Sequence, residues 1–344
     1  MIDWVTCEIP CLHPHPIAGG NVTKVDQDGV VDWSTSLPRS VVGSHDSSLR
    51  VRTVGIDEFG QGVMLRLDGN PAKWLQGHNL FGTDDLLGLV VATMNRLVPL
   101  LGLTPTFIDR KHWETGVYRL KRIDCTQMFD VGSTPNALAW IRQAEQNASL
   151  SHRGRGQITK GSTLYFGKHS RRWSLKFYAK GPEFEKHTPP ALRELPSLRA
   201  YAARALRCEV VMRSMELKSR GLDFAANWDE NDPYVVTMGI LGGLHMDDVT
   251  ALTPERIDSL RPAVRAVYQL WKEGHDIRGM YPKPTFYRYR KQLMDALSID
   301  IANVQPRDAE PSNVVPFLRI IEAKPMGVPD WAVGTDLYYE PQRA

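Results

Sequence analysis

A chain of 344 residues with 42% apolar and 24% charged residues has the composition of a folded globular protein, long enough for one large domain or two ordinary ones. Its apolar runs are shorter than the ~20 residues of a membrane span, and its first residues lack the apolar core of a secretion signal. Cys7, Cys11, Cys125 and Cys208 are too few for a disulfide framework, so we expect reduced structural thiols in a cytoplasmic protein with no membrane partner.

Strand and helix patterns alternate over the first part of the chain. Val63–Leu67 and Tyr118–Thr126 alternate like strands, and Asp84 is placed to cap a helix over residues 86–98. A second helix is expected to begin at Ser133 or Thr134, where Pro135 favours a helix start.

Two strands separated by a basic turn are predicted next, over residues 162–167 and 171–180. A helix over Ala191–Ala205 then leads into a strand over Leu206–Arg213. Strands interspersed with helices of this length predict an α+β fold, an antiparallel sheet with helices packed on one face.

The pattern changes beyond about Leu222. Helices are expected from Thr253 and from Thr285, and a proline-rich segment covers residues 305–331. We therefore predict a first domain over residues 1–225 and a mostly helical C-terminal region over residues 226–344, with a DNA-binding or accessory role.

Positive charge is concentrated between Ser151 and Lys180, a stretch that holds eight basic residues and no acidic one. Such runs are commonly solvated faces, but aromatic residues lie among these bases, which is typical of nucleic-acid binding. The candidate DNA-binding residues of this stretch are Arg153, Arg155, Lys168, Arg171, Arg172 and Lys176.

The predicted helix from Thr285 adds two more basic candidates, Arg288 and Lys291. Its alternative interpretation is an ordinary amphipathic helix with a buried stripe of Phe286, Tyr289 and Leu293. The DNA-binding and the amphipathic interpretations are compatible if the basic residues lie on the side of the helix opposite the buried stripe.

Strand periodicity places one tyrosine between lysines. In residues 173–180, Tyr178 shares the polar face with Lys176 and Lys180. By the same alternation, Asp124 and Glu209 point away from the apolar faces of their own strands. If these strands are neighbours, a tyrosine and two carboxylates share one face.

That combination suits phosphodiester chemistry. A tyrosine hydroxyl has a pKa of ~10, so as a nucleophile it needs nearby positive charge to favour the phenolate. Carboxylates can hold a divalent cation that neutralises the phosphate oxygens. The alternative is that the tyrosine packs and the acids form ion pairs.

Several blocks of the sequence resemble the gene II type replication initiators of filamentous bacteriophages, which are related to the HUH endonucleases and to plasmid rolling-circle initiators. The blocks are Arg122–Asp124, Ser170–Glu185, Leu206–Leu222, Asn70–Leu86, Asn313–Ile320 and Pro329–Trp331.

The resemblance implies an HUH-like nicking domain and a role for each residue of a Y-x-K-x-x-E pattern. Tyr178 matches the tyrosine that attacks the origin phosphodiester and becomes linked to the 5′ phosphate, and Lys180 and Glu183 match the other two residues. Resealing reverses this step. The implied partners are phage origin DNA, supercoiled duplex and single-stranded, with a host replication helicase and polymerase.

The His-hydrophobic-His metal motif of the HUH enzymes is absent. His13-Pro14-His15 lies in a proline-rich stretch where we expect a loop, whereas His78 lies inside a matching block and is equally a metal ligand or a turn residue. We expect Asp124 and Glu209 to hold Mg²⁺ or Mn²⁺, with His78 or Glu183 completing the shell. Glu183 pairing with Lys180 is the alternative. Glu185 and Glu216 are expected to be surface residues.

Two other functions remain open from the sequence. A non-catalytic DNA-binding replication or repressor protein on the same fold would use Tyr178 only to stack on a base. An RNA-binding α+β module would bind RNA rather than single-stranded DNA.

Overall fold

The computed structural model describes residues 1–43, 47–159, 162–246, 257–297, 301–302 and 325–340. The chain forms two compact units. Unit 1 comprises residues 1–137, 167–240 and 324–344, and unit 2 comprises residues 138–166 and 241–323. These units are groups of residues in mutual contact and each contains separate stretches of the chain. The boundary between independent domains near residues 225 and 226 stays a prediction.

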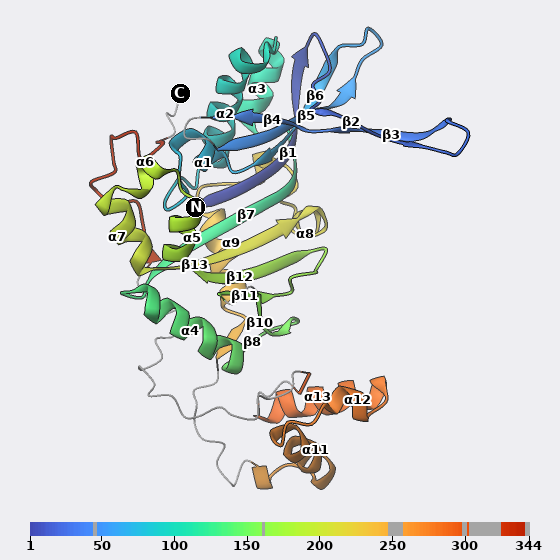
Figure 1. The fold of residues 1–344 in the computed structure, drawn as a ribbon, viewed down its shortest axis with the longest axis vertical. Coiled ribbons are helices and arrows are strands. Elements are labelled where there is room, and N and C mark those ends of the chain that lie inside the picture. The colour runs from blue at the N-terminus through green and yellow to red at the C-terminus, as the bar shows by residue number, and fades with distance from the viewer. Residues whose placement is uncertain (44–46, 160–161, 247–256, 298–300, 303–324, 341–344) are drawn as a thin grey trace. The chain divides into compact units, whose positions relative to one another are not determined.

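An antiparallel sheet forms the centre of unit 1 (Figure 1). In spatial order its strands are β12 (Trp173–Ala179), β13 (Ala205–Arg213), β7 (Arg119–Asp130), β1 (Ile2–His13), β6 (Gly62–Gly69), β5 (Ser48–Ile56) and β4 (Arg39–Val42). A short strand, β15 (Pro325–Met326), also pairs with β7. The predicted α+β class with an antiparallel sheet is confirmed.

Helices cover the apolar face of this sheet. Burial alternates along β1, so that Val5, Cys7 and Ile9 point into the core. Helix α3 (Phe107–Thr115) packs on β1, where the Trp113 indole donates to the Pro10 carbonyl at 2.6 Å. All four cysteines are free and buried, as expected of structural thiols.

Two helices differ from the prediction, one in its capping residue and one in its continuity. Helix α2 (Leu86–Leu101) is capped by Asp85, which accepts a hydrogen bond from the Gly88 amide at 2.9 Å, and Asp84 instead pairs with the N-terminal ammonium at 2.8 Å. The helix expected over Ala191–Ala205 is broken into α6 (Pro190–Arg193) and α7 (Pro196–Arg204). The break follows from Pro196, which lacks an N–H and keeps the preceding residue extended.

Unit 1 contains further helices, and Figure 1 shows one of them, α9 (Asp232–Leu241), behind the sheet. They are α1 (Pro71–Gln76), α5 (Lys180–His187), α8 (Ser214–Ser219), η2 (Ala225–Asn227) and α9, together with the start of α4 (Thr134–Asn147), which begins where predicted.

Residues 325–340 pack back onto unit 1. Ala332 is buried with Leu80, Phe81 and Phe184, and the Tyr339 amide donates to the Gln76 side chain at 2.9 Å. This segment therefore supports the loop after α1, which carries part of the site described below.

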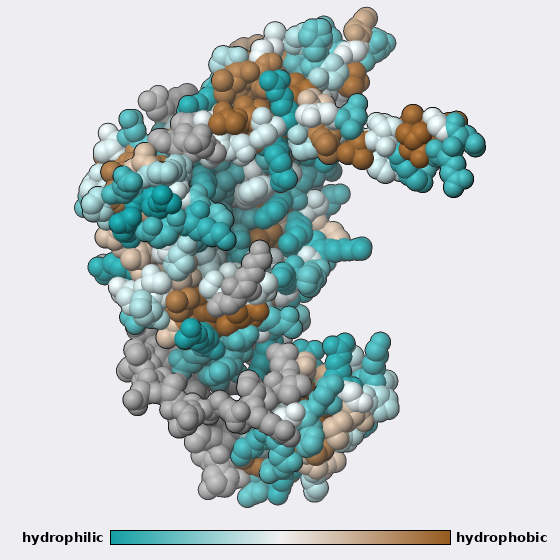
Figure 2. Space-filling view, viewed as in Figure 1, coloured by the Kyte–Doolittle hydropathy of each residue, from teal (hydrophilic) through white to brown (hydrophobic). Residues whose placement is uncertain are grey.

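A hairpin of β2 (Gly20–Val25) and β3 (Val31–Leu37) projects from the sheet (Figure 1). All of its strand residues are exposed. Figure 2 shows it standing clear of the surface with apolar side chains among polar ones, and the apolar ones include Val31 and Trp33.

Unit 2 contains short strands and a group of helices. Its strands are β8 (Ala148–Leu150), β9 (Gly154–Arg155), β10 (Gln157–Thr159), β11 (Thr163–Phe166) and β14 (Leu244–Met246). Its helices, α11 (Pro262–Lys272), α12 (Ile277–Met280) and α13 (Lys283–Leu297), share a core that includes Trp271, Phe286 and Leu293.

Of the segments expected in the C-terminal region, one helix is described and two lie outside the described residues. Helix α13 begins two residues before the expected Thr285, whereas the start expected at Thr253 and the block Asn313–Ile320 lie outside the described residues. Within the described part of the chain, no helix is long and apolar enough to span a bilayer.

Candidate active site

One face of three neighbouring strands carries the predicted tyrosine and carboxylates. In the β12–β13 register Lys176 is opposite Glu209 and Tyr178 is opposite Arg207. In the β13–β7 register Val211 is opposite Asp124. Paired residues point to the same face, so Tyr178, Glu209 and Asp124 share one side of the sheet, as strand periodicity predicted.

Tyr178 lies between positive and negative groups. Its hydroxyl donates to Glu209 Oε2 at 3.5 Å, and the ammonium groups of Lys176 and Lys180 lie 5.5 and 6.0 Å from its ring centre. Burial raises the pKa of Tyr178 well above its usual value, with Arg207 opposing and Glu209 adding to the rise. The expectation that nearby cations favour the phenolate is therefore not met by the protein groups alone.

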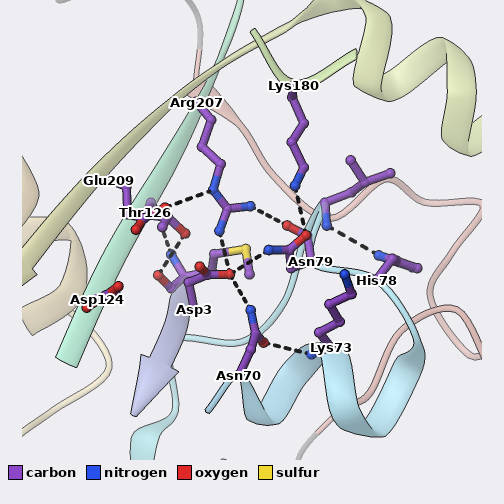
Figure 3. A network of polar contacts seen from close by, with 12 residues as sticks. Asp3, Asn70, Lys73, His78, Asn79, Asp124, Thr126, Lys180, Arg207 and Glu209 are labelled. Carbon is purple, nitrogen blue, oxygen red and sulfur yellow. Dashed lines mark hydrogen bonds and ion pairs between the residues drawn. The ribbon is translucent and has the colours of Figure 1, made fainter. Parts of the chain in front are cut away.

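A buried arginine and aspartate beside Tyr178 form a pair that the sequence analysis missed (Figure 3). Arg207 is fully buried, pairs with Asp3 at 2.5 Å, lies 3.9 Å from Glu209 and donates to the Asn79 carbonyl. Asp3 also accepts hydrogen bonds from Asn79 at 2.9 Å and Asn70 at 2.6 Å. Burial acts to raise the pKa of Asp3, but Arg207 and Lys180 lower it to about 2.

Asp3 reaches this face because β1 is irregular there. The register with β7 shifts between Ile2 and Trp4, which leaves Asp3 as an extra residue in the strand. The available signal was a charged residue among apolar neighbours, Asp3 beside Ile2 and Trp4 and Arg207 beside Leu206 and Cys208.

Asp124 and Glu209 are both buried and both ion-paired. Arg122 donates to the two oxygens of Asp124 at 2.7 and 2.6 Å, and Lys176 lies 2.5 Å from Glu209. Burial, together with the charge of Glu209, raises the pKa of Asp124 to about 7, although Arg122 opposes the rise. The two carboxylates are thus close enough to repel each other.

Lys180 begins α5 and is buried beside the tyrosine. It forms an ion pair with Glu183 and donates to Asn79 Oδ1 at 2.8 Å. Burial lowers the pKa of Lys180 to about 8, with Glu183 opposing. Of the two alternatives for Glu183, the structure shows the pair with Lys180.

Neither histidine considered for the metal shell lies with the carboxylates. His78 is buried, accepts a hydrogen bond from the Leu80 amide at 3.3 Å and contacts the Phe81 ring edge-on, and Figure 3 shows it across Asn79 from Asp124 and Glu209. Of its two interpretations, the contacts are those of a turn residue. His13 lies in β1 rather than in the expected loop, where its ring contacts Thr53 Oγ1 at 2.7 Å.

The metal expectation reduces to two residues. Among the described residues, no group of three or more His, Cys, Asp or Glu side chains is arranged to hold a metal ion. Asp124 and Glu209 remain as hard oxygen donors of the kind that Mg²⁺ and Mn²⁺ prefer. Their mutual repulsion is the feature that a bound cation would relieve, so the pair fits such an ion chemically.

Comparison with known proteins identifies the family. The N-terminal family of phage gene II type replication-associated proteins matches residues 1–231, and its C-terminal counterpart matches residues 252–341. The replication-associated protein of the same type from Enterobacteria phage I2-2 is 39% identical over 333 residues, which are 96% of this chain and 95% of that protein. This chain belongs to that family of phage replication-associated proteins.

The solved structures include a more distant match to this replication-associated protein. It is the rolling circle replication initiator protein from Geobacillus stearothermophilus, with 14% identity, a TM-score of 0.30, and coverage of 74% of this chain and 90% of that one. The resemblance to gene II type initiators expected from the sequence blocks is confirmed by the family match.

Four of the predicted DNA-binding residues of this replication-associated protein lie in unit 1. Lys168, Arg171 and Arg172 are exposed in the turn before β12, and Lys176 is half-buried in the site. Arg172 is held by Glu216 at 2.9 Å. Glu216, which we expected to be a surface residue, is buried, and it also pairs with Arg220 at 2.8 Å.

The other four lie in unit 2. Arg155 stacks over the Trp271 ring at 5.5 Å, and Arg288 is exposed on α13. Arg153 and Lys291 line one cavity of about 650 Å³. Phe286 and Leu293 are buried while Arg288 and Lys291 are exposed, so both interpretations of this helix are compatible.

Proposed function

We propose that this replication-associated protein is a metal-dependent, site-specific DNA nicking and closing enzyme that initiates rolling-circle replication of a filamentous phage genome. The observation that supports this most is the placement of the Tyr178 hydroxyl 3.5 Å from Glu209, on the sheet face that also carries Asp124. A nucleophile next to two carboxylates that can hold a cation suits phosphodiester transfer.

The proposed nicking step forms one bond and breaks one. Tyr178 Oη attacks the origin phosphorus while its proton passes to Glu209, the carboxylate that its hydroxyl faces. The bond from phosphorus to the 3′ oxygen breaks, which leaves the 5′ phosphate on Tyr178 and a 3′ hydroxyl that primes synthesis. Closing is the reverse attack of a 3′ hydroxyl on the phosphotyrosine.

Asp124 and Glu209 would hold the Mg²⁺ or Mn²⁺ ion of this reaction. Such a cation, when bound, supplies positive charge that neutralises the phosphate oxygens and favours the tyrosine phenolate. The two carboxylates orient it on the face that carries Tyr178. Arg122 and Lys176, which pair with them, would then be available to phosphate oxygens.

Lys180 serves as the proton donor to the leaving 3′ oxygen in this proposal. Its ammonium lies 6.0 Å from the Tyr178 ring centre, and its pKa of about 8 keeps it protonated at neutral pH yet able to release the proton. Glu183 and Asn79 hold the ammonium in place.

The proposed substrate is phage origin DNA, bound as supercoiled duplex and, after nicking, as a single strand. Eight basic residues are proposed to contact it, Arg153, Arg155, Lys168, Arg171, Arg172, Lys176, Arg288 and Lys291. A host helicase and a host polymerase would use the nick and its 3′ hydroxyl.

Nicking of supercoiled DNA that carries the intergenic region of the same phage tests this proposal. With Mg²⁺ or Mn²⁺ we expect open circles and a protein–DNA adduct that survives denaturation, both absent in Tyr178→Phe. Tyr234→Phe, at an exposed position on α9, is the matched control and should nick normally.

A non-catalytic DNA-binding protein is the second candidate. It is favoured by the ion pairing of Asp124 and Glu209 and by the raised pKa of Tyr178. Origin binding without nicking or adduct under every divalent ion tested would establish this candidate instead.

A further inference from the structure

A cavity of about 460 Å³ lies in unit 1, and its lining residue Asn70 hydrogen-bonds Asp3 of the candidate site. Trp4 lines it from β1, Asn70 and Lys73 from α1, and Lys186 and the following residues from the end of α5. Among the described residues its lining contains no carboxylate. A cavity with an aromatic ring and two lysines suits an anion that carries a flat ring.

Polar contacts lead from this cavity to Arg207, the residue paired with Tyr178 in the sheet. Asn70 donates to Asp3 at 2.6 Å, Asp3 pairs with Arg207 at 2.5 Å, and Arg207 lies opposite Tyr178 in the sheet. Figure 3 shows Asn70 on one side of Asp3 and Arg207 on the other. The cavity is therefore separated from the tyrosine site by the Asp3–Arg207 pair.

Trp4 is held rigidly at the boundary between the cavity and the carboxylates. It lies opposite Asp124 in the β1–β7 register, and its indole donates to Asp68 at 2.9 Å. The guanidinium groups of Arg122 and Arg50 lie 5.2 and 5.7 Å from its ring centre, and both are partly exposed. A fixed indole flanked by arginines can stack a base and bind its phosphates.

The lysines give the cavity its charge. The Lys73 ammonium donates to the His187 carbonyl at 2.9 Å, and this contact holds α1 against the end of α5. Lys186 is exposed at the same rim. An ammonium group has three donors, so Lys73 keeps capacity for a phosphate oxygen.

We propose that this cavity binds one nucleotide of the single strand adjacent to the nicked phosphate, with its base against Trp4 and its phosphate on Lys73 and Lys186. The position next to the nicked bond rests on the proposed function. The ligand class rests on the cavity itself, whose volume lies in the usual range for small-molecule sites of about 300–1,000 Å³.

Binding of a fluorescein-labelled oligothymidylate of about 12 nucleotides to the full chain tests this proposal, at about 100 mM salt and in a Tyr178→Phe background. Trp4→Leu should raise Kd about tenfold, whereas Trp4→Phe, which keeps a ring, should stay within about threefold. Lys73→Met and Lys186→Gln should each lower the log–log salt slope by about 0.7. Lys111→Gln, at an exposed position on α3, should change neither quantity.

Three results would overturn the assignment. The first is binding of the single strand by Trp4→Leu with wild-type affinity, and the second is a loss of affinity in Trp4→Phe as large as in Trp4→Leu. The third is a loss of affinity in Trp4→Leu that is as large for duplex DNA of the same length as for the single strand. If Trp4→Leu does not fold, the salt slopes of the two lysine variants decide. Adduct formation by the chain with Tyr178 intact is scored separately, so a failure of nicking leaves the binding result standing.

Discussion

Replacing Asp3 by asparagine tests the buried ion pair on which the candidate site is built. The Asp3 carboxylate accepts hydrogen bonds from Asn70 and Asn79 and neutralises the fully buried Arg207. Asparagine has nearly the same shape but no charge, so the change removes the charge with little loss of packing. Arg207 would keep the more distant carboxylates of Glu209, 3.9 Å away, and Glu183 as negative neighbours.

The magnitude follows from the pKa of Asp3, which is lowered from 3.8 to about 2 in the folded protein. A difference of about 1.8 units, at 1.36 kcal/mol per unit, stabilises the folded state by about 2 kcal/mol. Because the folded pKa lies below the unfolded one, this contribution is complete above about pH 4 and is lost as the pH falls towards 2. Leaving Arg207 without its main partner increases the loss.

The assay is urea unfolding measured at about pH 7 and about pH 3. Hydrogen exchange of the β1 and β13 amides then reports the stability of unit 1 separately from that of unit 2. Asp3→Asn should lower the free energy of unfolding by at least about 2 kcal/mol at the higher pH and by clearly less at the lower one. Asp28→Asn, at an exposed turn, should stay within about 0.5 kcal/mol. A loss for Asp3→Asn that is below about 0.5 kcal/mol, or equal at both pH values, would refute the reasoning.

Three further changes address the chemistry and the DNA contacts. Glu209→Gln should abolish nicking and its Mn²⁺ dependence while origin binding persists, and an unaltered Mn²⁺ titration would remove Glu209 from the metal site. Nicking should decline above about pH 8 as Lys180 loses its proton, and Lys180→Arg should slow the chemical step with binding unchanged; a rate that stays constant to about pH 10 would rule out this proton donor. Arg171→Gln should lower the salt slope of duplex binding by about one unit without loss of stability, whereas Arg172→Gln should also destabilise the protein because it leaves Glu216 short of a partner; identical thermal midpoints would contradict the second part.

Strand periodicity was sufficient to predict the shared face of Tyr178, Asp124 and Glu209. A two-residue period determines which side chains lie together once the strands are neighbours, and β12, β13 and β7 are neighbours. The pattern Y-x-K-x-x-E likewise placed Lys180 and Glu183 near Tyr178, because they are close in the chain and begin α5.

The contacts between distant segments could not be predicted in this way. Asp3 meets Arg207 only because β1 is irregular at its start and lies next to β7 in the interior of the sheet. Residues 2–13 contain Pro10, which argues against an interior strand in a sequence pattern. Glu216 looked like a surface acid because its partners, Arg172 and Arg220, are brought to it by a different strand and the end of α8.

The most direct test of the central claim is to map the covalent adduct that forms when the protein nicks supercoiled origin DNA with Mg²⁺ or Mn²⁺. The account predicts one modified peptide, with the 5′ phosphate of the nicked strand on Tyr178. An adduct on another residue, or nicked DNA with a free 5′ phosphate and no adduct, would contradict it.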